Sequence, residues 1–261
     1  MDKVVSVNVG LPKEVDWNGR RIRTAIWKEP VAGRVHVHQT NLDGDGQADL
    51  AGHGGIHRAV MAYQVESYRY WIDRFGQLEP GGFGENLTID GLPDSEVCVG
   101  DRIRIGEALF EVSQPRVTCY RIGVRLGHPD AAALLVAHLR PGFYLRVLEE
   151  GTVGAGDAIT IVSRDSEGMT IAEVSALLYL PDHPRAKLER VLRVAALSPG
   201  WQASFRALLE ASADGPPHGN AGLSPTQAVA WKGFRRLRIV SRTREGEGVQ
   251  CFVLSGEPGS D

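Results

Sequence analysis

The chain has 261 residues, of which 43% are hydrophobic and 23% are charged, so it can bury a sizeable core and is typical of a globular protein. Its 29 basic and 32 acidic residues are mixed along the chain and give a formal net charge of -3, which argues against nucleic acid or an anionic membrane as a partner. The first residues lack a basic start and an apolar run, and no stretch reaches the roughly 20 apolar residues of a membrane span, so we expect a cytoplasmic protein.

Short alternating runs bounded by Gly, Asp and Pro fill residues 4–162 and predict strands. Examples are the runs 35–38 and 108–112. A Gly-Asp turn followed by a strand occurs twice, at 99–105 and at 155–161. Two matching corners of this kind favour a barrel over a repeat array.

Two helices are predicted to interrupt these strands, at about 64–75 and about 129–139. The first ends at Gly76, and its expected apolar stripe consists of Val65, Tyr68, Ile72 and Phe75. The second stops before Pro141 and Gly142. We therefore expect an α+β, β-rich fold in which a β-barrel carries peripheral helices.

The pattern changes after residue 163, because residues 170–210 predict three short helices separated by proline. Thr170 and Glu173 form a capping box, and Pro184 and Pro199 fit the first turns of the second and third helices. Residues 211–230 have the Ala, Gly, Pro and Ser content of a linker, and strand-like runs follow at 237–240 and 249–254. The expected divisions are a barrel domain at 1–166, a three-helix domain at 167–212, a linker at 213–230 and the start of a further unit at 231–261.

Cys119 is the first candidate for chemistry. It follows the strand 108–112 and stands between Arg116 and Arg121. Nearby cations stabilise a thiolate, which is the form that attacks electrophiles or binds soft metals. The alternative is that Cys119 is a small buried hydrophobe. Cys98 has apolar and acidic neighbours, and we expect it in the core.

A glycine pair, Gly54 and Gly55, is flanked by His53 and His57 and followed by Arg58, just before the first helix. Glycines let backbone N–H groups approach a ligand, and the arginine adds charge, so this loop suits an anionic group. A zinc site at the two histidines is disfavoured because no further ligand has suitable spacing. His36 and His38 share one face of a strand, and we leave them outside the site.

A glycine-rich segment at 80–84 precedes Asn86 and Thr88, which alternate along a predicted strand and can present polar groups to one face. Its pattern matches neither a P-loop nor a dinucleotide fingerprint. Residues 43–49 imitate a calcium loop, but the positions that require glycine and glutamate carry Ala48 and Gly54. We interpret this segment as a solvated turn.

Four of these segments together resemble the MOSC family, named for the molybdenum cofactor sulfurase C-terminal domain, and in particular its YiiM-like branch. The matches are TAIWKEPV at 24–31, DGQADLAGHGGIHRAV at 45–60, GGFGENLT at 81–88 and QPRVTC at 114–119. The resemblance covers most of residues 3–210, and the predicted helices at 170–210 are similar to the three-α domain of this branch.

The resemblance implies a barrel that holds the mononuclear pyranopterin form of molybdenum cofactor, with Cys119 as the metal ligand; binding of pyridoxal phosphate is not expected. It suggests that Arg58, Arg116 and the loop from His53 through Gly54 to Gly55 hold anionic groups of the cofactor. Asn86 and Thr88 would be hydrogen-bonding wall residues. Many relatives carry an Asp-Lys pair after the glycines, where this chain has His57 and Arg58.

Members of this type reduce N-hydroxylated compounds, including hydroxylamino purines, to amines and water. His53 or His57 is the expected proton donor, because histidine titrates near neutral pH. Residues 231–237 and 249–254 resemble the opening strands of a ferredoxin-reductase-like FAD module. This resemblance suggests a chain cut from a longer protein, in which flavin and an iron-sulfur centre, or a separate reductase or ferredoxin, would supply electrons.

Two other functions remain open at this stage. Cys119 can act as a sulfur carrier that forms a persulfide, using the same thiolate. The domain can also be a module that only stores or delivers the cofactor. Bound molybdenum and turnover distinguish the reductase from both alternatives.

Overall fold

A computed structural model describes residues 2–48, 54–210, 237–246 and 249–256. The chain divides into two compact units, residues 1–225 and residues 226–261. Predicted site residue His53 and the predicted linker at 213–230 lie outside the described residues.

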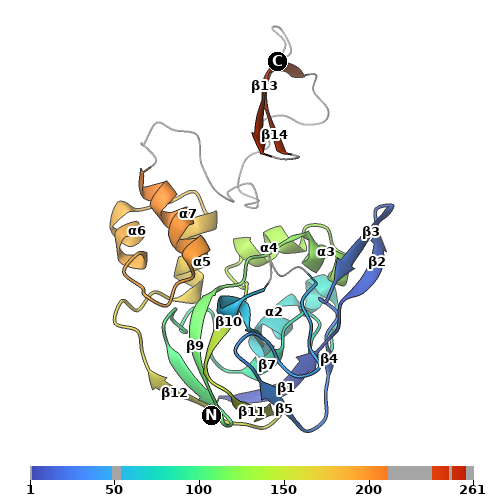
Figure 1. The fold of residues 1–261 in the computed structure, drawn as a ribbon, viewed down its shortest axis with the longest axis vertical. Coiled ribbons are helices and arrows are strands. Elements are labelled where there is room, and N and C mark those ends of the chain that lie inside the picture. The colour runs from blue at the N-terminus through green and yellow to red at the C-terminus, as the bar shows by residue number, and fades with distance from the viewer. Residues whose placement is uncertain (1, 49–53, 211–236, 247–248, 257–261) are drawn as a thin grey trace. The chain divides into compact units, whose positions relative to one another are not determined.

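The first unit is built on an eight-stranded sheet in the order β12-β8-β9-β10-β6-β7-β1-β4. Its strands are β1 (Lys3–Val9), β4 (Glu29–Pro30), β6 (Val60–Gln64), β7 (Leu87–Asp90), β8 (Arg102–Ile105), β9 (Ala108–Pro115), β10 (Phe143–Glu149) and β12 (Ile159–Ser163). All neighbours pair antiparallel except β6 and β7, which pair parallel. The strand-rich α+β class is therefore confirmed (Figure 1).

Two small antiparallel sheets accompany the large one. β5 (Arg34–Val37) pairs with β11 (Gly151–Gly154), and β2 (Lys13–Trp17) pairs with β3 (Arg20–Thr24). The repeated Gly-Asp turns precede β8 and β12, which pair with each other through Ile103 with Ile161 and Ile105 with Ile159. The sequence repeat thus supplies two adjacent strands with matching apolar residues.

The predicted barrel stays a prediction. The sheet order ends at β12 and β4, so the strand pairing of the described residues forms no closed ring. Backbone bonds nevertheless join β1 to the segment before β12: the amide of Val4 donates to the carbonyl of Asp157 at 2.9 Å, and that of Gly156 donates to the carbonyl of Val4 at 2.8 Å. These bonds connect β1, the second-last strand in the sheet order, to the segment that precedes β12, the strand at the other end.

Helices cover this sheet at several places (Figure 1). They are the 3-10 turn η1 (Ile56–Arg58) and the helices α2 (Val65–Phe75), α3 (Tyr120–Leu126) and α4 (Ala131–Ala137). The predicted positions of α2 and α4 are confirmed, and α3 was not predicted. The predicted stripe on α2 is wrong in part: Ile72 is 48% exposed, whereas Ser67, Trp71 and Phe75 are the buried residues. Their spacing of four places all three on one helical face.

Three further helices, α5 (Ile171–Tyr179), α6 (Arg185–Val191) and α7 (Pro199–Glu210), confirm the predicted three-helix segment. The capping box is present: the hydroxyl of Thr170 accepts the backbone N–H of Glu173 at 3.1 Å, and the carboxylate of Glu173 accepts the backbone N–H of Thr170 at 3.3 Å. Pro199 begins α7, and Pro184 immediately precedes α6.

The second unit contains β13 (Leu237–Gly246) and β14 (Val249–Gly256), which form an antiparallel pair. The two predicted strand-like runs near the end of the chain are therefore strands. Within the described parts of both units, no helix combines the length and the apolar character needed to cross a membrane.

Candidate functional site

The described residues of the first unit surround a pocket that holds about 670 Å³ of space between atoms, including its open mouth. Three neighbouring elements build its floor: η1, β6 and β10 contribute Arg58, Met61 and Tyr144. Met61 and Tyr144 lie opposite each other in the register of β6 and β10, so their side chains lie on one face of the sheet. The segment between β9 and α3 forms one wall.

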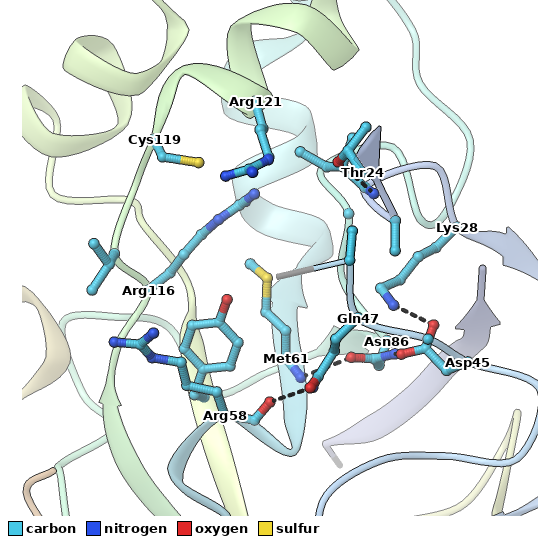
Figure 2. A pocket seen from close by; sticks show the side chains of 17 residues that line it. Thr24, Lys28, Asp45, Gln47, Arg58, Met61, Asn86, Arg116, Cys119 and Arg121 are labelled. Carbon is cyan, nitrogen blue, oxygen red and sulfur yellow. Dashed lines mark hydrogen bonds and ion pairs between the residues drawn. The ribbon is translucent and has the colours of Figure 1, made fainter. Parts of the chain in front are cut away.

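Cys119 lies in that wall, directly before the first residue of α3. β9 ends at Pro115, and the amide of Arg116 then donates to the carbonyl of Gly142 at 2.9 Å, which fixes the start of the connecting segment. Cys119 is half-buried and lines the pocket together with Arg116 and Arg121. Figure 2 shows the sulfur and the ends of both arginine side chains directed toward the same space. The structure therefore places the sulfur and two cationic side chains on the lining of one pocket.

Arg116 carries an observation that bears directly on ligands. Its side chain is 7% exposed, and its Nη1 is buried without a hydrogen-bond partner among the described residues. A buried guanidinium normally has an acceptor for each of its N–H groups, because a buried hydrogen-bond donor without an acceptor destabilises the folded protein. Because Arg116 lines the pocket, this unsatisfied N–H group can donate a hydrogen bond to an acceptor on a bound ligand.

The opposite wall holds a buried ion pair between Lys28 and Asp45, which are 8% and 2% exposed (Figure 2). Asp45 also accepts the backbone N–H of Gly10 at 2.9 Å and the side-chain amide of Asn86 at 2.9 Å. Burial lowers the pKa of Lys28 from its usual value, and the neighbouring Asp45 carboxylate opposes that shift. The expected solvated turn at residues 43–49 is therefore wrong for Asp45, because its carboxylate satisfies three donors inside the fold.

The glycine-rich loop before β7 forms another part of the pocket boundary. Gly84 has a φ of +81°, and a Cβ there would lie 2.6 Å from Cγ1 of Ile26, so only glycine fits without rearrangement. Glu85 is fully buried and holds this loop by accepting the backbone N–H groups of Gly81 at 2.9 Å and Phe83 at 3.1 Å. The buried carboxylate of Glu85 therefore holds the loop in its conformation.

Four of the predicted site residues line the pocket: Arg58, Asn86, Arg116 and Cys119. Asn86 has both ends of its amide engaged, since its oxygen accepts the N–H of Met61 at 3.1 Å and its nitrogen donates to Asp45. Its role in this structure is thus to position the buried ion pair. Whether it also contacts a ligand stays a prediction.

Other predicted residues lie elsewhere. Thr88 is 2% exposed behind the pocket, where its hydroxyl donates to Glu85 at 2.6 Å and accepts from Asn8 at 3.0 Å. Gly54, Gly55 and His57 are not among the residues that line the pocket. Burial and the cations Arg146 and Arg58 lower the pKa of His57, while Glu111 opposes them, so the imidazole is biased toward its neutral form. Cys98 is 8% exposed, as predicted for a core cysteine.

The sequence reasoning assigned no role to Lys28, Asp45 or Tyr144. Lys28 and Asp45 lie within the motif matches at 24–31 and 45–60, so the motifs contained a signal for them. Tyr144 lies on an alternating strand with no distinguishing pattern. Burial raises the pKa of Tyr144, and the Arg116 and Arg58 cations partly offset that rise, so its hydroxyl keeps its proton at neutral pH.

Comparisons with known proteins agree with this geometry. Residues 49–160 match the MOSC domain, and residues 169–211 match the YiiM-like, 3-alpha helix domain. The protein YflK of Bacillus subtilis is 38% identical over 203 residues, which cover 77% of this chain and 92% of YflK. The crystal structure of YiiM from Geobacillus stearothermophilus is 32% identical, with a TM-score of 0.68 over 80% of this chain and 100% of that one.

A protein of Gibberella moniliformis that is named a reductase is 33% identical over 166 residues, which cover 61% of this chain and 29% of that protein. The matched domains, the near-complete coverage of YflK and of YiiM from Geobacillus stearothermophilus, and the shared fold lead to one conclusion. This chain belongs to the MOSC-domain family and carries the 3-alpha helix domain of its YiiM-like members.

Proposed function

We propose that this protein binds the mononuclear pyranopterin molybdenum cofactor through Cys119 and reduces N-hydroxylated compounds to amines. The observation that carries the proposal is a pocket lined by Cys119 and by Arg116, whose buried Nη1 has no hydrogen-bond partner among the described residues. MOSC domains are associated with this cofactor, and one relative is named a reductase.

The residues of the pocket fit the group. Its charged side chains are Lys28, Arg58, Asp45, Arg116 and Arg121, so four cations face a single carboxylate. Four of the five charged side chains that line the pocket are therefore cationic, a composition that suits an anionic ligand. A soft thiolate beside these cations is a suitable donor for a metal that already has sulfur ligands.

Each residue then has a distinct task. Cys119 would supply the protein ligand, and Arg116 with Arg58 would hold anionic groups of the cofactor. When bound, the cofactor would supply a metal that exchanges two electrons with the substrate. The overall reaction is the conversion of R–NHOH, two electrons and two protons into R–NH2 and water. The bond broken is N–O, and an external reductase or ferredoxin would provide the electrons.

The protons require donors that face the pocket. Lys28 lines it, and because burial lowers the pKa of Lys28, its ammonium gives up a proton more readily than that of an exposed lysine. Tyr144 lines it too and keeps its proton at neutral pH, so its hydroxyl can donate a hydrogen bond to the substrate. We propose these two residues in place of His57, which does not line the pocket.

The source of electrons is a separate part of the proposal. The pair β13 and β14 in the second unit is compatible with the opening strands of an FAD-binding module, as the sequence resemblance suggests. A fused flavin and iron-sulfur module, or a separate reductase, would then deliver electrons in the cytoplasm. Reduction of the protein by added ferredoxin and its reductase tests this route independently of the site.

Turnover tests the function. Protein purified from a host that makes the cofactor is supplied with a reduced viologen dye and a hydroxylamino purine, and the amine product is quantified. The turnover rate of Cys119→Ala should be at least about 100-fold lower, since this change removes the only proposed protein ligand of the metal. Cys98→Ala is the matched control, because it deletes a thiol outside the pocket. Equal rates in both variants would contradict the proposal.

A further inference from the structure

We infer that a second site, formed by His36, His38 and Glu150, binds a divalent transition metal such as zinc at the edge of the β11–β5 sheet. One ligand atom from each of these residues can be chosen so that all three lie within 4.8 Å of one another. None of the three lines the pocket that contains Cys119. The site is therefore separate from the proposed reductase centre.

The register of two strands creates the cluster. His36 lies within β5 and His38 directly follows it, so their side chains lie on the same face. β11 pairs with β5 through Gly151 with Val37 and Thr152 with His36. Continuing this pairing by one residue brings Glu150 opposite His38, on the face that carries both imidazoles. The two rings accordingly approach to 4.6 Å between centroids.

The carboxylate of Glu150 is held in place. Its Oε1 accepts the backbone N–H of Gln39 at 2.9 Å, and its Oε2 lies 3.8 Å from Nε2 of His36. Donors bonded to zinc at about 2.0–2.2 Å in a tetrahedral arrangement lie roughly 3.4 Å apart. Small rotations of exposed side chains therefore suffice to close this cluster around an ion.

Neighbouring groups support a cation. The carboxylate of Asp43 lies 2.7 Å from Nε2 of His38, and a carboxylate on a ligating imidazole commonly fixes its orientation and raises its basicity. In that place Asp43 can orient the ring of His38. Arg34 is the nearby cation of β5, and it is engaged by Asp157 at 2.9 Å. The cluster therefore keeps a local excess of negative charge.

The donor set decides the class of metal. Two imidazole nitrogens and one carboxylate oxygen suit zinc, copper or nickel, whereas calcium and magnesium prefer oxygen donors alone. His36, Glu150 and His38 are 40%, 41% and 48% exposed, so an ion can enter and its remaining position stays open to water. Bound there, it would cross-link β5 to the segment that joins β10 to β11.

Calorimetric titration of the metal-free 261-residue chain with zinc chloride tests this site. All proteins carry Cys119→Ala, so that the pocket thiol does not add zinc uptake. We expect one equivalent of zinc whose affinity falls at least about 10-fold in His36→Gln and in Glu150→Gln, as is seen when a metal site loses supporting groups. Glu149→Gln is the matched control, because this adjacent side chain pairs with Arg104 instead.

Copper provides a second measurement on the same protein. The electron paramagnetic resonance spectrum of bound Cu²⁺ should show hyperfine coupling to two imidazole nitrogens, reduced to one in His38→Gln. Unchanged zinc affinity in the His36 and Glu150 variants, equal affinity for Ca²⁺, or a copper spectrum without imidazole nitrogen would each overturn the assignment. These outcomes do not depend on the molybdenum proposal.

Discussion

Replacing Asp45 with asparagine should destabilise the protein strongly, because it leaves the Lys28 ammonium buried without its counter-ion. Lys28 is 8% exposed and Asp45 is 2% exposed, so water does not screen the loss. Removing one partner of a buried ion pair costs about 3–5 kcal/mol. For a unit of this size that corresponds to a decrease in Tm of roughly 10 °C.

The pH dependence of this loss has a defined sign. Burial already lowers the pKa of Lys28 below its unfolded value of 10.5, so the unfolded chain binds more protons between the two pKa values and stability rises with pH there. Without Asp45 the pKa of Lys28 in the folded protein falls further. The buried side chain then becomes a neutral amine at a lower pH than in the unmodified protein. The stability deficit of Asp45→Asn should therefore shrink as the pH rises from about 7 to about 10.

Urea unfolding at several pH values, with a chelator present, measures this difference. Asp43→Asn is the matched control, since Asp43 lies two residues away and its side chain is 63% exposed. Its cost should stay within about 0.5 kcal/mol. A deficit in Asp45→Asn that is below about 1 kcal/mol, or that does not change with pH, would refute the buried-pair reasoning.

Three further changes test other parts of the structure. Thr170→Ala removes the capping box of α5 and should lower the free energy of unfolding by about 1 kcal/mol in urea, whereas an unchanged value would exclude a stabilising cap. Burial raises the pKa of Asp94 to about 6, above its unfolded value of 3.8, so stability should fall by up to about 3 kcal/mol as the pH rises from about 4 to about 6. Asp94→Asn should lack this decrease, and a variant that retains it would show that other groups cause it. Arg116→Met should slow alkylation of Cys119 by iodoacetamide at least about 3-fold in a Cys98→Ala background, because it removes a cation that favours the thiolate. Arg102→Met is the control for that measurement, since Arg102 pairs with Glu111 away from the pocket.

Much of the fold was predictable because local signals agree with it. The Gly-Asp turns, the strands that follow them and the capping box at Thr170 depend on nearby residues, and the structure has them where the sequence indicates. Helix α3 was missed because it is short and contains Gly123, which has low helix propensity. The structure explains that glycine: a Cβ there would lie 2.9 Å from the carbonyl oxygen of His128, so close packing excludes a larger residue.

Part of the site was predictable, either from residues that are neighbours in the sequence or, for Arg58 and Asn86, from the family resemblance. Arg116 and Cys119 lie three residues apart, so their proximity follows from the local segment. Lys28 and Asp45 are separated by 17 positions, and charged residues in loops are normally expected at the surface. Their burial depends on Asn86 and Gly10, which contact Asp45 from distant parts of the chain. No local pattern contains that arrangement.

The most direct test of the account is the molybdenum content of freshly purified protein, together with the fluorescence of its oxidised pterin. Wild-type protein and Cys98→Ser should each contain about one molybdenum and one pterin per chain, and Cys119→Ser should contain less than about a tenth of that molybdenum. Molybdenum retained at full occupancy in Cys119→Ser would contradict the claim that this sulfur binds the metal. Sulfane sulfur on Cys119 in protein that lacks molybdenum would instead indicate a sulfur carrier.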